Sequence, residues 1–459
     1  MTDRGTGNTT FDEHGHRVTG QIWRWTALAG MASYLDAGSI VALGSGLALW
    51  QEYLGLNNSA VGALAAIGPN AIGAAIGAFV GGRLGDLLGR KRIYQYDLLV
   101  YAFGILLIAF AVNSPMLFIG TVIVGIAVGA DVPTSLALVG EFAPDHARGR
   151  LLGFTQIAWS LGPIIVLIVA FALAPLGLLG IRIVFAHLCV FALVTWYLRR
   201  GLVESARWTA ASGAAPAERS SDPSAQPELA PIPHHVASRL ANLFSGPNLA
   251  ALIWTATVYL TWNIAAGTNG IFLPYILRTL GAESQAASVG LQCLSFILTL
   301  VATFLIFMPF SDRGMGSRRL MWGIGAVMQV AAFAIFLIFP FTTPVALGNI
   351  ILFGIGAALA GEAFYKTWSQ ELFPTLLRGT AQGITFGTAR VFLGIWSFFV
   401  PVLAAAGIGP VALLLMILLA ISGVVGFLWM PDTAGKSLEE IEAERGTLTQ
   451  DGVQAPTAT

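Results

Sequence analysis

Charged residues are scarce in this sequence. Asp, Glu, Lys and Arg make up 10% of its 459 residues, whereas a soluble domain carries about a quarter. Hydrophobic residues make up 56%, so the composition indicates a membrane protein rather than a soluble domain. The formal net charge is zero, and we therefore expect no nucleic acid or other strongly charged partner.

Cysteine is nearly absent as well. Cys189 and Cys293 both fall inside apolar runs, which excludes a disulfide framework and gives no metal site. Residues 1–20 are polar and lack the apolar segment of a cleavable signal peptide. The sequence also has no phosphate-binding loop and no nucleophile elbow. We therefore predict a protein that is not an enzyme and needs no cofactor.

Long apolar runs dominate the rest of the chain. A helix needs roughly 20 apolar residues to cross the hydrocarbon core of a bilayer. Runs of about this length or longer occur at 22–50, 60–82, 92–112, 115–140, 151–174, 180–198, 249–278, 286–310, 319–340, 344–371, 380–405 and 409–430. We therefore predict an all-α membrane protein with twelve transmembrane helices.

The two halves of the chain repeat the same charged motifs. GGRLGDLLGRKR at 81–92 corresponds to PFSDRGMGSRR at 309–319, so that Asp86 matches Asp312. EFAPDHARG at 141–149 corresponds to ELFPTLLRG at 371–379. The nearly constant offset predicts a parallel repeat, with two pseudo-symmetric six-helix bundles of the kind found in secondary transporters.

The repeat also sets the expected domains. We predict an N-terminal tail at 1–21, bundles at 22–199 and 249–430, a linker at 200–248 and a C-terminal tail at 431–459. The linker is rich in Ala, Pro and Ser, and its end, HHVASRLANLF, can form a short amphipathic helix. Most Lys and Arg residues lie in the tails and the even-numbered connections. The positive-inside rule then predicts a multi-pass protein of the cell membrane with both termini in the cytoplasm.

These motifs resemble those of the major facilitator superfamily, and within it the sugar-porter branch. GGRLGDLLGRKR resembles the superfamily's loop between helices 2 and 3, and EFAPDHARG and ELFPTLLRG resemble the branch's loops after helices 4 and 10. VESARW at 203–208 and PDTAGKSLEEIE at 431–442 resemble the motifs after helices 6 and 12. The resemblance implies a secondary transporter with alternating access, of the type that carries an inositol-like polyol or another metabolite with protons.

Opposite charges recur at the predicted cytoplasmic helix ends. We expect them to form a cytoplasmic gate whose ion pairs join the two halves and then part; the alternative is that they cap helices and fix topology. Asp97, near one of these ends, is expected to pair with Arg90 and its neighbours. The predicted gate residues are Asp86, Arg90, Glu141, Arg148, Asp312, Glu371 and Arg378.

Asp36 lies in the middle of the first apolar run. An isolated charge at that depth is costly, so we expect it to face a wet cavity or a partner. Ser33 and Ser39 share its side of a helix. The stretch LDAG matches the helix-1 aspartate that is a protonation site in proton-coupled sugar porters. The arginine of helix 4 that partners it in that family is replaced here by Thr121.

Other ionisable residues also fall inside apolar runs. Asp131 lies on predicted helix 4, Glu362 and Lys366 lie on helix 10, and Arg390 lies on helix 11. We predict Asp36, Asp131 and Glu362 as proton-coupling candidates, with acids of the first half pairing with bases of the second across a central cavity. The alternative is that Glu362 and Lys366 only neutralise each other.

The resemblance further suggests a set of substrate-binding side chains. Amides and indoles suit hydroxylated solutes, because amides donate and accept hydrogen bonds and rings stack on C–H faces. The sugar porters' helix-10 tryptophan corresponds to Gly361 here, and their helix-7 glutamines correspond to Asn263 and Ile264. The predicted substrate-binding residues are Gln156, Asn263, Asn269, Lys366, Trp368 and Arg390.

The sequence thus predicts a proton-coupled importer of an inositol-like polyol or a sugar, acting as a monomer in the lipid bilayer. An alternative is a facilitator or proton antiporter that exports a charged or amphiphilic compound, since buried Glu362, Lys366 and Arg390 suit a charged substrate. A third alternative, of another class, is a transporter-like membrane sensor.

Overall fold

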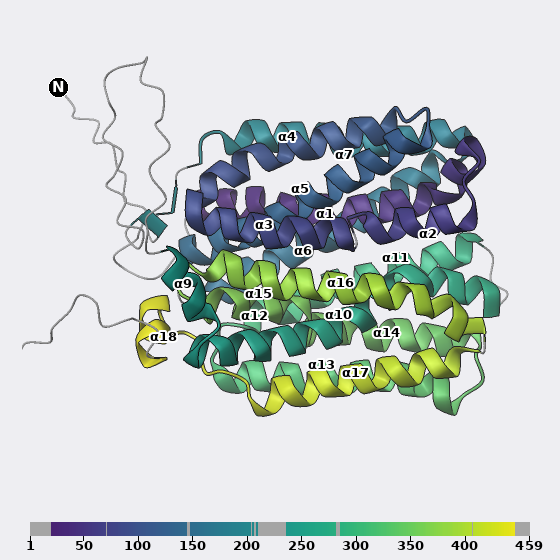
Figure 1. Ribbon diagram of the computed structural model, residues 1–459. Helices are drawn as coiled ribbons and strands as arrows, with labels where there is room; N and C mark the ends of the chain where they lie inside the picture. The colour runs from purple at the N-terminus through teal and green to yellow at the C-terminus, as the bar shows by residue number, and fades with distance from the viewer. Residues whose placement is uncertain are drawn as a thin grey trace, which may run out of the picture.

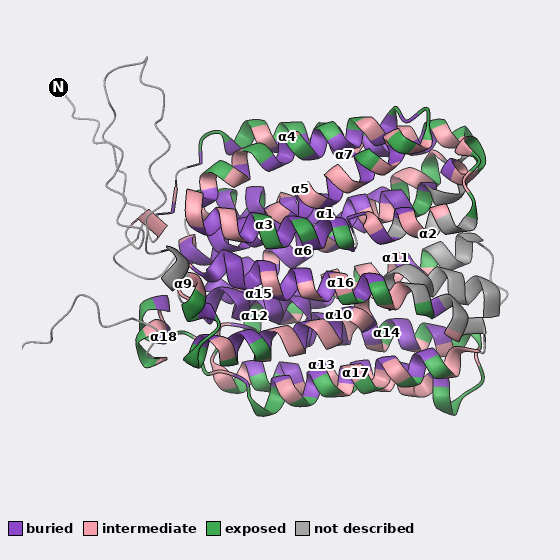
Figure 2. Ribbon diagram, viewed as in Figure 1, coloured by how far each residue is buried: buried purple, intermediate pink, exposed green. Residues whose placement is uncertain are grey.

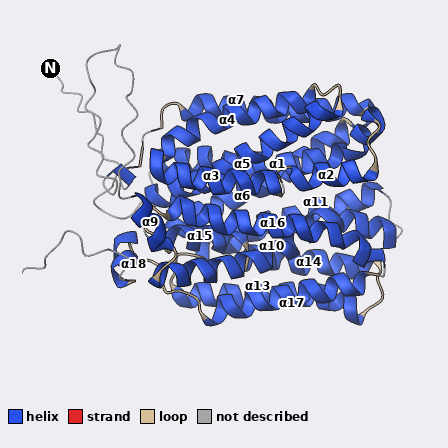
Figure 3. Ribbon diagram, viewed as in Figure 1, coloured by secondary structure: helices blue, strands red, loops and turns tan. Residues whose placement is uncertain are grey.

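The computed structural model describes residues 20–69, 71–144, 147–202, 204–205, 208–209, 236–280, 285–405 and 407–445. Residues 1–19 of the predicted N-terminal tail, most of the predicted linker and residues 446–459 of the predicted C-terminal tail lie outside this part. Among the described residues the regular structure is entirely helical, as Figure 3 shows. Ten of these helices are long and apolar enough to cross a membrane.

Every predicted apolar run holds helix. In the first half these are α1 (Gly20–Leu54), α2 (Asn58–Ile67), α3 (Ile72–Leu88), α4 (Arg90–Ala109), α5 (Ser114–Phe142), α6 (Arg148–Ala172) and α7 (Leu178–Arg199), with the short η2 (Ala174–Leu176). In the second half they are α10 (Gly246–Leu280), α11 (Gln285–Ala302), η3 (Thr303–Phe307), α12 (Met308–Phe310), α13 (Met315–Ile338), α14 (Thr343–Leu359), α15 (Glu362–Glu371), α16 (Arg378–Ala405) and α17 (Ile408–Leu428).

The helices form two layers, with α1–α7 on one side and α10–α17 on the other (Figure 1). Two short helices lie at one end of the molecule: α9 (Val236–Leu243), in the segment where the sequence predicts a helix, and α18 (Leu438–Glu444). We call this end the termini face, because α1 begins there and α17 ends there. The C-terminal segment packs against it, with Leu438 and Ile441 buried.

Small residues let the two layers approach closely where α3 meets α16. A Cβ atom on Gly82 would lie 2.2 Å from the carbonyl oxygen of Gly379, so any larger residue would force these helices apart. Burial is concentrated along the same interface. All ten residues of α15 are buried, and Figure 2 shows this helix in the second layer, on the side that faces the first. Such close contact suits membrane helices, whose association depends on packing rather than on exclusion from water.

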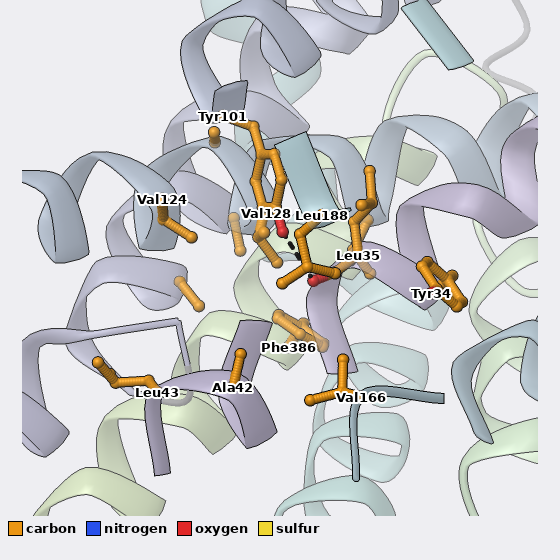
Figure 4. Packing of buried hydrophobic residues seen from close by; sticks show 14 of the residues in the cluster. Tyr34, Leu35, Ala42, Leu43, Tyr101, Val124, Val128, Val166, Leu188 and Phe386 are labelled. Atoms are coloured by element: carbon orange, nitrogen blue, oxygen red, sulfur yellow. Dashed lines mark hydrogen bonds between the residues drawn. The ribbon is translucent and has the colours of Figure 1, made fainter. Parts of the chain in front are cut away.

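The apolar core of the first half reaches across to the second. Tyr101 on α4 donates a hydrogen bond to the carbonyl oxygen of Leu35 on α1, 3.3 Å away and dashed in Figure 4. Phe386 of α16 lies in the same view and belongs to the same buried cluster as Leu35 and Val166. The stretch of α1 that carries Asp36 is therefore fixed by packing on both sides.

One membrane segment is interrupted in its middle. The backbone leaves the helical conformation at Ala360 and Gly361, so that α14 ends and α15 begins with Glu362. The Gln329 side-chain amide donates to the freed carbonyl of Ala360 at 2.8 Å. It also lies 3.2 Å from the carbonyl of Gly356, which still accepts from the backbone amide of Ala360. A buried side chain thus donates to a backbone carbonyl that water cannot reach at this depth.

Candidate functional site

Asp36 lies at the interface between the two halves and is 1% exposed. Its Oδ2 accepts a hydrogen bond from the indole nitrogen of Trp159 on α6 at 3.2 Å. The same oxygen lies 3.5 Å from Nη2 of Arg390 on α16. Ser39 donates to the backbone carbonyl of Asp36 instead of to its carboxylate. The buried acid of the first half is therefore paired with a base of the second.

A second polar contact crosses the interface close by. Lys366 on α15 donates a hydrogen bond to Oε1 of Gln156 on α6 at 2.9 Å. Its Nζ also lies 3.7 Å from Oε1 of Glu362, one turn earlier on α15. Lys366 therefore pairs with Glu362 in its own half, and among the described residues of the first half it contacts the amide of Gln156 and no acid. The site thus holds four charged side chains, those of Asp36, Glu362, Lys366 and Arg390. Their charges sum to zero, which lowers the free-energy cost of burying them.

Two small hollows lie beside these charges. The first is lined by Arg390, Asn263 and Leu393 among others, and we call it the Arg390 hollow. The second is lined by Gln156 and Asn269 among others, and we call it the Gln156 hollow. Each offers about 70 Å³ to the centre of a water-sized sphere. A single water needs roughly 10–15 Å³ by this measure, so each hollow has room for several waters. Both hollows share the lining residues Trp159, Trp262, Ala266, Phe296 and Glu362.

Most of the predicted substrate-binding residues meet at these hollows. Asn263 donates from Nδ2 to the Tyr259 hydroxyl at 3.3 Å, while its Oδ1 is buried without a hydrogen-bond partner among the described residues. Trp368 lies elsewhere. Its indole is packed against Trp254, Trp322 and Phe364 in the core of the second half, and it lines neither hollow.

The structure corrects the expectation for Asp131. It does not face the central cavity; its Oδ2 lies 3.1 Å from Nη1 of Arg199 at the end of α7. Asp97 also turns to Arg199, at 3.7 Å, and not to the Arg90 cluster. Arg199 further stacks over the Tyr94 ring at 3.6 Å. The sequence placed Arg199 at a helix end, where basic residues are common, and gave no signal that it turns into the bundle.

Two aspartates make reciprocal contacts at the termini face. Asp86, at the end of α3, accepts hydrogen bonds from the backbone amides of Gly379 and Thr380 in the first turn of α16. Asp312, the matching residue of the repeat, accepts from the amides of Gly149 and Arg150 in the first turn of α6, both at 2.9 Å. Each half thus places a carboxylate on a helix N-terminus of the other, where free amides and the helix dipole favour negative charge.

Ion pairs surround these two contacts. Between the halves, Arg378 lies 3.1 Å from Glu141, and Arg148 lies 3.7 Å from Glu371. Within the halves, Arg90 binds Glu141 at 3.0 Å, and Arg318 binds Glu371 at 2.7 Å. All seven predicted gate residues are therefore brought together. Arg318 was not among the predicted gate residues, and it takes the place in the second half that Arg90 takes in the first.

Trp159 and Trp262 line both hollows and were not predicted either. Trp159 follows Gln156 by three residues on α6, so the helical period already placed both side chains on one face. Trp262 precedes Asn263 on α10, and no pattern in the sequence distinguished its side of the helix.

Comparison with known proteins identifies a family that this chain matches. The model of the family described as "Sugar (and other) transporter" matches residues 26–444. The chain is 41% identical to the minor myo-inositol transporter IolF of Bacillus subtilis (strain 168), over 91% of this chain and 93% of that protein. It is 27% identical to the glucose transporter GlcP of Staphylococcus epidermidis, over 81% and 86%.

Solved structures agree on the fold. A structure of the major facilitator superfamily proton:xylose symporter XylE matches with a TM-score of 0.76 and 21% sequence identity, covering 92% of this chain and 98% of that one. At this identity the match concerns the fold, which is the all-helical fold of major facilitator transporters.

Proposed function

We propose that this chain, which belongs to the family of sugar (and other) transporters, imports a polyol or sugar together with protons by alternating access. The similarity to a myo-inositol transporter over most of both chains supports an inositol-like polyol as the substrate. The distribution of Lys and Arg supports a cell-membrane protein whose termini face is cytoplasmic, and we propose that it acts as a monomer.

The observation that carries this proposal is the pair of polar contacts between the halves, Asp36–Arg390 and Lys366–Gln156, beside two hollows. Substrate hydroxyls that bind Gln156 compete with its contact to Lys366, which holds the halves together. Substrate occupancy and the relative position of the halves are therefore linked, as alternating access requires.

The proton step follows from the Asp36 contacts. Addition of a proton from outside neutralises the carboxylate and removes its attraction to Arg390. With the Asp36–Arg390 ion pair gone, the two halves can move relative to each other while the cavity changes sides. Release of the proton into the cytoplasm restores the charge and the pair with Arg390. Each cycle moves one proton on this carboxylate, and a proton gradient directed inward drives uptake.

The balance of charge favours this reading over export of a charged compound. Lys366 and Arg390 each lie beside an acid, so the described site offers a substrate no excess charge of either sign. A neutral, hydroxylated solute loses less solvation in such a site than an ion does.

Asp36→Asn in proteoliposomes tests the proposal. The amide keeps the shape of the side chain but cannot cycle a proton, so we expect gradient-driven accumulation of labelled myo-inositol to disappear while exchange at equal pH survives. Asp131→Asn is a matched control, because Asp131 is a buried acid of the same half that lies on Arg199. Accumulation by Asp36→Asn at the wild-type level would refute the coupling role, and loss of exchange as well would make Asp36 a substrate ligand.

A further inference from the structure

Gly361 has no room for a side chain. A Cβ atom there would lie 2.3 Å from the carbonyl oxygen of Ala357 and 2.8 Å from Cζ2 of Trp262. The indole of Trp262, which comes from α10, thus rests directly on the break between α14 and α15. A ring from a different helix occupies the space beside the position at which the sugar-porter resemblance expects a helix-10 tryptophan.

The orientation of Trp262 is fixed on several sides. Its indole N–H donates to Oε1 of Gln329 at 2.8 Å, and the Gln329 amide nitrogen is held by the carbonyl of Ala360. Tyr259 stacks beside the indole with 6.1 Å between ring centroids, and Tyr365 stacks on Tyr259 at 3.6 Å. Because the N–H group is already bonded, Trp262 can offer a ligand only its aromatic ring.

Trp159 supplies a second ring from the other half. Its indole N–H is bonded to Asp36, so this residue too has only its ring to offer. Phe296 lies beside it, with 5.8 Å between ring centroids. Trp159 and Trp262 both line the Arg390 hollow and the Gln156 hollow, and amide side chains lie at each hollow.

We infer that Trp159 and Trp262 are specificity-determining residues that make the site select cyclic polyols over open-chain polyols. This inference rests on the proposed function. A cyclic polyol presents a preformed apolar C–H face, which stacks on an indole while its hydroxyls reach the amides. An open-chain polyol presents no such face until several of its bonds have been frozen, and that ordering weakens its binding. Gln329 acts through Trp262 and is a positioning residue.

Binding to the purified full chain tests the inference. Displacement of labelled myo-inositol is measured with unlabelled myo-inositol and with sorbitol, an open-chain hexitol. We expect the wild type to prefer the cyclic compound by at least tenfold. Trp262→Leu should weaken myo-inositol binding and reduce this preference to less than threefold, while Trp262→Phe keeps most of it. Trp254→Leu is the matched control: Trp254 lies on the same helix with its N–H bonded to Val425, and it lines neither hollow.

Two further variants change residues that contact the Trp262 indole. Gly361→Ala should displace the Trp262 indole and also lower the preference. Because its Cβ would also press on the Ala357 carbonyl, Gln329→Leu is the variant that serves if Trp262→Leu does not fold. Gln329→Leu frees the indole N–H, so we expect a higher KM for myo-inositol uptake with little change in kcat. A merely structural role would instead lower the amount of folded protein and leave KM unchanged.

The possible failures are distinct. If Trp262→Leu and Gly361→Ala both keep the wild-type preference, the inference is wrong while the proposed function stands. If the wild type prefers the cyclic compound and the variants lose this preference, the inference holds. If the same wild-type protein shows no proton-driven accumulation, the proposed coupling is wrong. Wild-type protein that binds neither compound overturns both.

Discussion

Asp86→Asn is the sharpest test of the predicted gate at the termini face. The Asp86 carboxylate accepts from the amides of Gly379 and Thr380, and the Thr380 hydroxyl donates to it at 2.6 Å. Its Oδ1 also lies 2.9 Å from Nη2 of Arg90, within the same half. An asparagine of the same shape has only one acceptor oxygen. Its NH2 group then faces either the Gly379 amide or the Thr380 donors, so at least one buried N–H loses its acceptor.

The expected size of the effect follows from these bonds. A hydrogen bond to a charged group contributes about 1.5–3 kcal/mol, and a buried donor left without a partner costs about 1–3 kcal/mol. Part of the loss is offset because the remaining oxygen keeps one bond. We therefore expect the closed arrangement to lose about 2–4 kcal/mol relative to an open one in which water solvates Asp86. At about 1.4 kcal/mol per tenfold, this is a shift of roughly 30-fold to 700-fold in the equilibrium between them.

Hydrogen–deuterium exchange in nanodiscs measures this shift. Opening of the termini face should speed exchange at 378–380, where the amides of Gly379 and Thr380 donate to Asp86. It should also speed exchange at 148–150, where the amides of Gly149 and Arg150 donate to Asp312. The amides at 148–150 make no direct contact with the substituted side chain, so a change there reports separation of the halves. Faster exchange confined to 378–380 would mean that Asp86 only caps α16, and the gate would be refuted. Asp432→Asn, on an exposed acid of the C-terminal segment, is the control.

Two further predictions concern residues that the structure places in unexpected contacts. Arg199→Met leaves two buried carboxylates, Asp97 and Asp131, without their cation, and should destabilise the protein by about 3–5 kcal/mol in thermal unfolding; Asp131→Asn keeps the Asp97–Arg199 pair and should cost much less. Equal losses in the two variants would contradict this account. Gly149→Ala should weaken the contact with Asp312, because the added Cβ would lie 2.7 Å from its Oδ1, and exchange at 378–380 should then rise as in Asp86→Asn. Unchanged exchange there would show that the two contacts are independent.

The sequence determined the large-scale organisation of this protein. Each apolar run holds helix, because a chain in lipid must satisfy its backbone hydrogen bonds internally. The repeat of the motif around Asp86 and Asp312 predicted matching sites, and each aspartate does contact a helix N-terminus of the opposite half. Asp36 was identified as a buried acid at the centre because it is isolated in a long apolar run. These three predictions, of the helices, of the matching sites and of the buried acid, depend on length, spacing and composition, which are read directly from the sequence.

Tertiary structure decided the partners. Arg390 was one of two buried bases predicted in the second half, and it is the one that pairs with Asp36. Asp131 pairs with Arg199, and Trp262 fills the space beside Gly361. In a soluble protein the apolar stripe of a helix shows which face turns inward. A membrane helix is apolar on every side, so its rotation about its own axis is set by packing against its neighbours. The residues that meet across the interface were therefore fixed only when the helices packed together.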